Sequence, residues 1–130
     1  MSAKYGKAIG EEARYREKDV LLGPGVNIYR TPMNGRNFEY MGEDPYLASV
    51  MCVPYIQELQ KNGVAACVKH YALNNQELWR GHIDVNLSDR ALYEIYLPAF
   101  KAAVEEGGAW SIMALTIRFA ASTPAITISH

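Results

Sequence analysis

Hydrophobic and polar positions divide the chain into segments of two alternating kinds. Apolar residues recur at helical spacing in three segments and form short continuous runs in three others. Glycine, proline and asparagine, which favour turns, bound most of these segments. We therefore predict helices at 2–17, 45–62 and 89–106, and strands within 19–28 and at 64–71 and 109–114.

Start and stop signals support the two later helices. Asp44 followed by Pro45 is a typical helix N-terminus, and Ser88 is a suitable cap for the helix at 89–106. Pro54 and Pro98 each predict a kink, because proline removes a backbone hydrogen bond inside a helix. One apolar stripe on the last helix is expected to face the core: Leu92, Ile95, Tyr96, Ala99, Phe100, Ala103 and Val104.

The order of these elements predicts the architecture. Strand, helix, strand, helix, strand corresponds to two consecutive βαβ units and a parallel sheet. Right-handed crossovers place the helices on one side of that sheet, which leaves its other face bare. We therefore predict an α/β fold with about three parallel strands that form part of a larger structure, most simply an arc of a (β/α)8 TIM barrel.

Composition narrows the class of protein. The chain has 130 residues, 49% hydrophobic and 21% charged, so it can build a core and forms one domain or part of one. The formal net charge of −1 gives no reason to expect nucleic acid or an anionic membrane as partner. Cys52 and Cys67 stand alone, which favours buried thiols over a disulfide or a metal site. The sequence leaves the native compartment open.

The candidate chemistry lies in the stretch Lys69–Glu77. Lys69 and His70 come at the carboxyl end of a predicted strand, where ligands of α/β folds bind. Adjacent strand residues normally point to opposite faces of a sheet. The backbone therefore has to bend sharply there if both side chains are to reach one ligand.

Four motifs in order carry a resemblance to a known family. They read LGPGVNIYR at 22–30, GRNFEYMGEDP at 35–45, KHYALNNQE at 69–77 and RALYEIYLPAF at 90–100. Together they resemble glycoside hydrolase family 3, the β-glucosidase type, over roughly residues 8–113. Several long motifs in the right order are far more specific than a single short pattern.

The resemblance implies a TIM-barrel catalytic domain that hydrolyses terminal β-linked glucose, or a similar sugar, with retention. It implies that Arg36, Lys69 and His70 hydrogen-bond the hydroxyls of the sugar, and that a cis non-proline peptide lies beside the last two. Retaining glycosidases use two carboxyl groups about 5 Å apart and need no metal or organic cofactor. The expected partner is a small oligosaccharide or a β-glucoside.

The chain departs from the family pattern in two places. The Ser-Asp-Trp-like motif of the family's nucleophile does not occur, and the acid/base carboxylate usually comes from later sequence. We therefore expect sugar-binding residues without either catalytic carboxylate, and a chain that is inactive alone. Residues 115–130 do not continue the family pattern, but one permitted back-translation reads Tyr-Asn-Pro-Phe-Arg-Gly in another frame. This predicts a barrel fragment at 1–114 followed by a frameshifted tail.

Simpler roles compete with sugar binding for several residues. Arg36 could be a loop arginine paired with Glu39 or Glu43. Asn74, Asn75 and Glu77 are expected to hold their loop by hydrogen bonds rather than to touch substrate.

Two alternatives concern the whole chain. Exposed sheet edges and a bare sheet face predict a homo-oligomer, so the chain could be a non-catalytic fragment that self-associates. A stand-alone enzyme would instead need an improvised carboxylate pair, formed by Glu39, Glu43 or Glu77 with Asp84.

Overall fold

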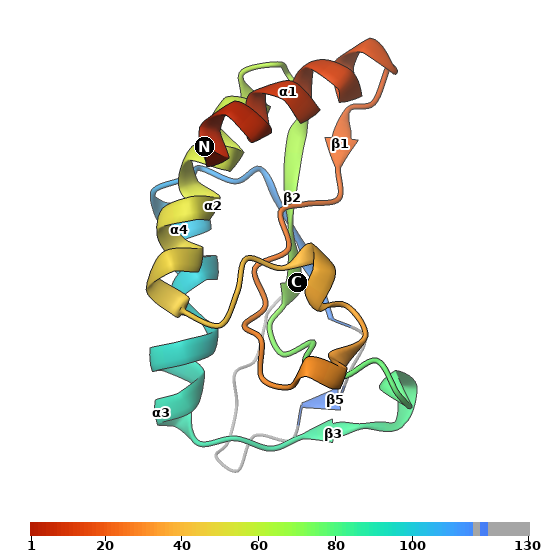
Figure 1. The fold of residues 1–130 in the computed structure, drawn as a ribbon, viewed down its shortest axis with the longest axis vertical. Coiled ribbons are helices and arrows are strands. Elements are labelled where there is room, and N and C mark those ends of the chain that lie inside the picture. Colours follow the sequence, from red (N-terminus) through yellow and green to blue (C-terminus); the bar gives the residue numbers. More distant parts are fainter. Residues whose placement is uncertain (116–117, 120–130) are drawn as a thin grey trace.

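A three-stranded parallel sheet lies at the centre of the fold (Figure 1). The structure is a computed structural model that describes residues 1–115 and 118–119. The strands follow the order β1-β2-β4. Their bounds are Val20–Leu21 for β1, Ala65–Tyr71 for β2 and Ser111–Ala114 for β4. The main helices are α1 (Ser2–Tyr15), α2 (Pro45–Gln60) and α4 (Pro98–Glu105).

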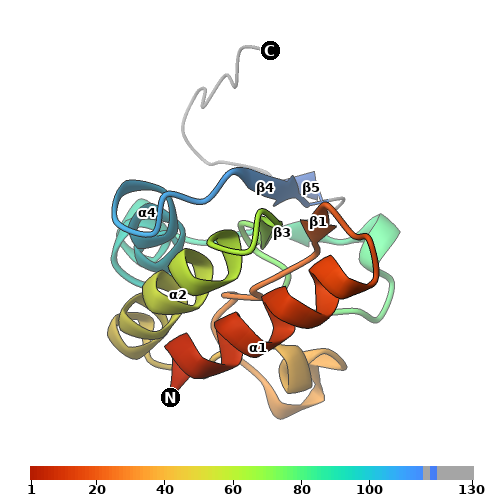
Figure 2. The same ribbon diagram turned by 90° about the horizontal axis from the view of Figure 1, so that it is seen from above.

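The helices cover one side of this sheet. Seen from above, α1 and α2 lie on the same side of β1 and β4 (Figure 2). Ala66 and Val68 of β2 are fully buried in one cluster with Ile56 and Leu59 of α2. The chain therefore has the predicted α/β fold and forms an arc of a TIM barrel. Within the described residues, no helix is long and apolar enough to cross a membrane.

Close contact between α1 and α2 depends on two glycines. A Cβ atom at Gly6 would collide with the backbone carbonyl of Tyr55. At Gly10 it would lie 2.9 Å from the carbonyl oxygen of Leu59, which real Cβ atoms essentially never do. Side chains at these positions would force the two helices apart.

The segment 89–106 was predicted to be one helix, and this prediction is wrong because the helix is not continuous. It is divided into α3 (Asp89–Ala91), the π-helical segment η4 (Leu92–Tyr96) and α4. The amide of Leu97 donates to the carbonyl of Leu92 at 3.0 Å, an i→i−5 bond, directly before Pro98, which has no N–H and opens α4. Two members of the predicted stripe are exposed, Ile95 in η4 and Val104 in α4.

The predicted strand within 19–28 is limited to β1. The chain then bends through a cis Gly23–Pro24 bond, and Gly25 forms isolated bridges with both Tyr40 and Lys69. A Cβ at Gly25 would lie 2.8 Å from the carbonyl oxygen of Glu39. Glycine therefore allows three distant segments to meet, as the Gly-Pro-Gly sequence suggested.

Side chains cap the N-termini of two helices, as predicted. Asp44 accepts hydrogen bonds from the amides of Tyr46 and Leu47 at 2.8 and 3.1 Å, and Ser88 accepts one from Ala91 at 3.2 Å. Helix α2 continues through Pro54. Cys52 and Cys67 are both free and buried.

Short elements connect the main ones. The 3-10 turns are η1 (Pro32–Asn34), η2 (Asn37–Glu39) and η3 (Arg80–His82). A second parallel sheet pairs β3 (Asp84–Val85) with β5 (Arg118–Phe119). Most of the predicted frameshifted tail, 115–130, lies outside the described residues, and its reading frame stays a prediction.

Candidate functional site

The candidate site lies where β2 ends. Lys69 and His70 are joined by a cis peptide bond, as the family resemblance implied. The side chain of Asn27 holds the backbone at this point: its Oδ1 accepts from the His70 amide at 2.7 Å. Its Nδ2 donates to the carbonyl oxygens of His70 and Ala72 at 2.9 and 3.0 Å. Asn27 is 2% exposed, so these bonds are sheltered from water.

One carboxylate connects two of the three predicted site residues. Glu39 Oε2 lies 2.6 Å from Lys69 Nζ, and Glu39 Oε1 accepts a hydrogen bond from Arg36 Nε. All three side chains are at most one quarter exposed. The arrangement therefore fixes two cationic donors next to each other and gives both of them one shared counter-charge.

Burial and charge act in opposite directions on these groups. Burial alone would raise the pKa of Glu39, but the hydrogen bonds and charges of Lys69 and Arg36 outweigh it and leave the pKa below its usual value. Burial would likewise lower the pKa of Arg36, and its bond to Glu39 leaves it raised instead. Glu39 is thus ionised at neutral pH and Arg36 is charged.

A second carboxylate, Glu77, lies beside this group. Its Oε1 is 3.5 Å from Arg36 Nη1, and its Oε2 is 3.2 Å from Arg80 Nη1. The same Oε1 accepts from Asn74 Nδ2 at 2.9 Å. Glu77 and Asn74 therefore hold the loop after β2, which is the structural role expected for them.

His70 is the third predicted residue, and it lies against an aromatic ring. It is 7% exposed, and its Nδ1 is 3.2 Å from the hydroxyl oxygen of Tyr40. The two rings meet edge to face, with centroids 6.1 Å apart. Burial, together with the charges of Arg36 and Lys69, lowers the pKa of His70 to about 4. The ring is consequently neutral at pH 7.

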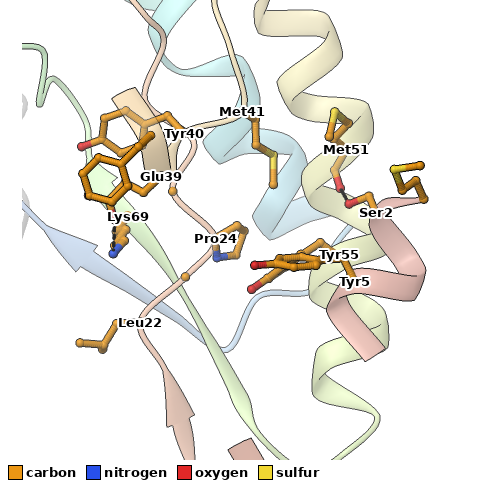
Figure 3. Close-up of a pocket in the computed structure, with 14 residues that line it drawn as sticks. Ser2, Tyr5, Leu22, Pro24, Glu39, Tyr40, Met41, Met51, Tyr55 and Lys69 are labelled. Carbon is orange, nitrogen blue, oxygen red and sulfur yellow. Dashed lines mark hydrogen bonds and ion pairs between the residues drawn. The ribbon is translucent and has the colours of Figure 1, made fainter. Parts of the chain in front are cut away.

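Three of these residues, Glu39, Tyr40 and Lys69, border a hollow of about 670 Å³. Figure 3 shows Glu39, Tyr40 and Lys69 on one side of it and Tyr5 with Tyr55 on another, with Pro24 between them. The walls away from the ion pairs are formed mainly by aromatic, proline and methionine side chains. Lys69 thus lies at the margin of a space with largely apolar walls, whereas Arg36 and His70 are not part of its lining.

Three contributors to the site were not singled out from sequence. Asn27 is a polar residue inside the apolar stretch Val26–Ile28, and that contrast is the signal that could have identified it. Tyr40 appeared only as part of a motif, and Glu39 only as a possible partner of Arg36 or a member of an improvised carboxylate pair, not as a link between Arg36 and Lys69. No cluster of three metal-ligating side chains occurs among residues 1–115 and 118–119.

Comparison with known proteins identifies related chains. The model of the glycosyl hydrolase family 3 N-terminal domain matches residues 1–128. Beta-glucosidase BoGH3A of Bacteroides ovatus is 90% identical over 113 residues, which cover 87% of this chain and 15% of that protein. An exo-alpha-(1->6)-L-arabinopyranosidase of Bifidobacterium longum is 47% identical over 110 residues, covering 85% of this chain and 14% of the relative.

A solved structure shows the same arrangement of elements. Beta-glucosidase 3B from Thermotoga neapolitana, in complex with glucose, superposes with a TM-score of 0.88 and 46% sequence identity. The match covers 91% of this chain and 16% of that one. This chain therefore spans about one sixth or less of the length of these relatives.

Proposed function

Because this chain belongs to glycoside hydrolase family 3, we propose that it is the sugar-holding part of a retaining β-glucosidase that hydrolyses terminal β-linked glucose. In this proposal Arg36, Lys69 and His70 bind hydroxyls of the sugar being cleaved. The observation that supports it best is the bridge of Arg36 and Lys69 through the Glu39 carboxylate, next to the neutral His70 ring.

The three residues suit sugar hydroxyls by their chemistry. Guanidinium and ammonium groups are permanent donors, and a neutral imidazole can also donate. Donors that are fixed before the sugar binds orient the ring, and they strengthen as charge develops in an oxocarbenium-like transition state. None of the three can serve as nucleophile or as carboxylic acid, so the proposed role is binding and orientation.

We further propose that the carboxylates that cleave the bond are absent from this chain. The two carboxylates at the site are each engaged by two cationic side chains: Glu39 by Arg36 and Lys69, and Glu77 by Arg36 and Arg80. A catalytic pair must instead be free to take up a proton or attack the sugar. The proposed chemistry uses carboxylates alone and calls for no cofactor or metal.

A titration of the purified 130-residue chain with glucose, followed by NMR, tests the binding role. Glucose should perturb signals of residues around Lys69, and Lys69→Ala should weaken the binding about tenfold, the effect of one charged hydrogen bond. Lys101→Ala is the matched control, because the Lys101 side chain is 70% exposed on α4. Binding that is absent, or equal in both variants, would overturn the proposal.

Hydrolysis of an aryl β-glucoside tests the missing carboxylates. The chain should show no turnover above that of a Lys69→Ala, His70→Ala double variant. Turnover that Glu39→Gln or Glu77→Gln abolishes would instead mean that one of these residues acts in an improvised carboxylate pair. A parallel titration with L-arabinopyranose tests which sugar the chain prefers, because a 47% identical relative is named as an arabinopyranosidase.

A second candidate function is self-association without sugar binding. Strand β4 is an edge of its sheet, and beside it lies a hollow lined by Pro98, Lys101, Glu105 and six aromatic or aliphatic residues. The six are Tyr71, Tyr93, Leu97, Phe100, Val104 and Ile112. An edge strand next to exposed apolar side chains favours pairing with another copy of the chain.

A further inference from the structure

We propose that Asn74 and Tyr40 are positioning residues that fix the proton of the neutral His70 ring on Nε2, so that His70 acts as a hydrogen-bond donor toward the sugar. The inference rests on the proposed function for the identity of the ligand. The arrangement of protons itself follows from three side chains in contact, and it can be tested without any sugar.

The first step is the orientation of the Asn74 amide. Its Nδ2 lies 2.8 Å from the Tyr40 hydroxyl oxygen and 2.9 Å from Glu77 Oε1. A reversed amide would place its oxygen against a carboxylate oxygen, two acceptors with no proton between them. The Glu77 carboxylate oxygens also face donors of Arg36 and Arg80, so they act as acceptors in these contacts. The amide therefore presents NH2 to both neighbours, and the Tyr40 oxygen accepts from Asn74.

The second step concerns the single proton of the Tyr40 hydroxyl. Tyr40 is 6% exposed, and burial raises its pKa to about 12, so the phenol keeps this proton. The hydroxyl has two contacts among the described residues, Asn74 and His70 Nδ1. Since Asn74 is itself the donor in the first contact, the hydroxyl proton is left for the second. Tyr40 donates and His70 Nδ1 accepts.

The third step is the state of the imidazole. The groups with charge around it are Arg36 and Lys69, which disfavour its protonation, and Glu39 and Glu77, which favour it less strongly. A neutral ring carries one proton, and Nδ1 is occupied as an acceptor, so that proton lies on Nε2. Nε2 has no hydrogen-bond partner within the part of the chain that the structure describes. It is therefore available to a ligand as a donor, alongside Arg36 and Lys69.

The decisive variant is Asn74→Asp, because it reverses the direction of the hydrogen bonds. The variant and its control are both made in a Glu77→Gln chain, because the new carboxylate would otherwise lie against Glu77 Oε1, which the Asn74 amide contacts at 2.9 Å. In that chain an aspartate oxygen accepts from the Tyr40 hydroxyl, which then accepts from His70 and pulls the proton to Nδ1. The ordinary imidazole side chain already favours Nε2–H, so a change to Nδ1–H goes against the intrinsic preference. The matched control is Asn75→Asp, which introduces the same charge one residue away without a contact to Tyr40.

The tautomer is read at pH 7 from long-range ¹H–¹⁵N spectra of the histidine-labelled chain, with His70→Gln assigning the signals and the exposed His82 as reference. We expect Nε2–H in the unmodified chain and in Asn75→Asp, and predominantly Nδ1–H in Asn74→Asp. Tyr40→Phe should move the His70 Nδ1 signal to the position of a nitrogen without a hydrogen bond. This second variant adds nothing charged and tests the same contact if Asn74→Asp does not fold.

Each outcome decides one of the two proposals. An Nδ1–H or doubly protonated His70 in the unmodified chain, or a Nδ1 signal unchanged in Tyr40→Phe, would overturn the positioning role. The Nε2–H tautomer, with a Nε2 signal that responds to added glucose, supports both the positioning role and sugar binding. The same tautomer without any response to glucose supports the proton arrangement and overturns the proposed function.

Discussion

Asn27 and His70 form two hydrogen bonds with each other across 43 positions of sequence. The Asn27 side chain accepts from the His70 amide at 2.7 Å and donates to the His70 carbonyl at 2.9 Å. It also donates to Ala72. One buried amide therefore satisfies backbone groups that the sheet does not pair at the point where β2 ends.

Replacing Asn27 by alanine should destabilise the fold strongly. The change leaves the buried amide and carbonyl of His70 and the part-buried carbonyl of Ala72 without these partners, which costs roughly 2–4 kcal/mol in the free energy of unfolding. Urea unfolding followed by circular dichroism measures this loss. Asn86→Ala is the control, because Asn86 is exposed and its removal should cost less than about 0.5 kcal/mol. Equal effects in the two variants would contradict the structural role of Asn27.

Glu39→Gln tests how much the shared carboxylate stabilises its two cations. The change leaves Arg36 and Lys69, both largely buried, without their common counter-charge, and we expect a loss of about 2 kcal/mol in unfolding free energy. Glu94→Gln removes an exposed carboxylate that pairs with Arg90 one helical turn away, and it should cost about 0.5 kcal/mol or less. A larger loss of unfolding free energy in Glu94→Gln than in Glu39→Gln would show that the contacts of Glu39 with Arg36 and Lys69 do not stabilise the fold.

Stability should depend on pH through His70. Its pKa is lowered from 6.5 to about 4 in the folded chain, mainly by burial and then by the charges of Arg36 and Lys69. Between pH 6.5 and pH 4 the unfolded chain binds a proton that the folded chain does not. The free energy of unfolding is therefore highest above pH 6.5 and decreases as the pH falls to 4, by about 3 kcal/mol in total.

Urea unfolding at steps between pH 7.5 and pH 4 measures this dependence. His70→Gln should flatten the curve above pH 5, whereas His82→Gln should leave it unchanged, because His82 is exposed. Below pH 5 the lowered pKa of Glu39 adds a further loss in the same direction. A curve that stays equally steep in His70→Gln would assign the pH dependence to other groups.

Local signals explain which parts of the fold were predictable. Helix α2 is capped by Asp44 at its start and ends before Gly63. Strand β2 begins as an apolar run after a turn and ends in the polar residues Lys69 and His70 followed by Tyr71. Caps, breakers and hydrophobic runs act over a few residues, so sequence reveals them. The same signals placed Lys69 and His70 at the end of β2, and the family motifs pointed to Arg36, which shares the Glu39 carboxylate with Lys69. Their role in sugar binding stays a prediction.

Interactions between distant segments explain the rest. A π-helical segment lies before Pro98 where an α-helix was predicted. The spacing of apolar residues does not distinguish these two kinds of helical turn over so short a segment. The link from Glu39 to Lys69 joins residues 30 positions apart, and that from Asn27 to His70 joins residues 43 apart. Such pairs depend on how β1 and the loop after it return to the end of β2, which no local pattern encodes.

The edge of the sheet supports a last prediction, that the isolated chain self-associates. Ile112 lies on the edge strand β4 and is 40% exposed, next to the apolar hollow along α4. Ile112→Lys places a charge where a second copy would pack, and it should weaken association at least tenfold. Sedimentation equilibrium over a range of protein concentrations measures the change. Leu78→Lys is the control, since Leu78 is 70% exposed in the loop after β2 and away from this edge. A chain that stays monomeric at high concentration, or that loses association equally in both variants, would show that β4 and its neighbours are not the contact surface.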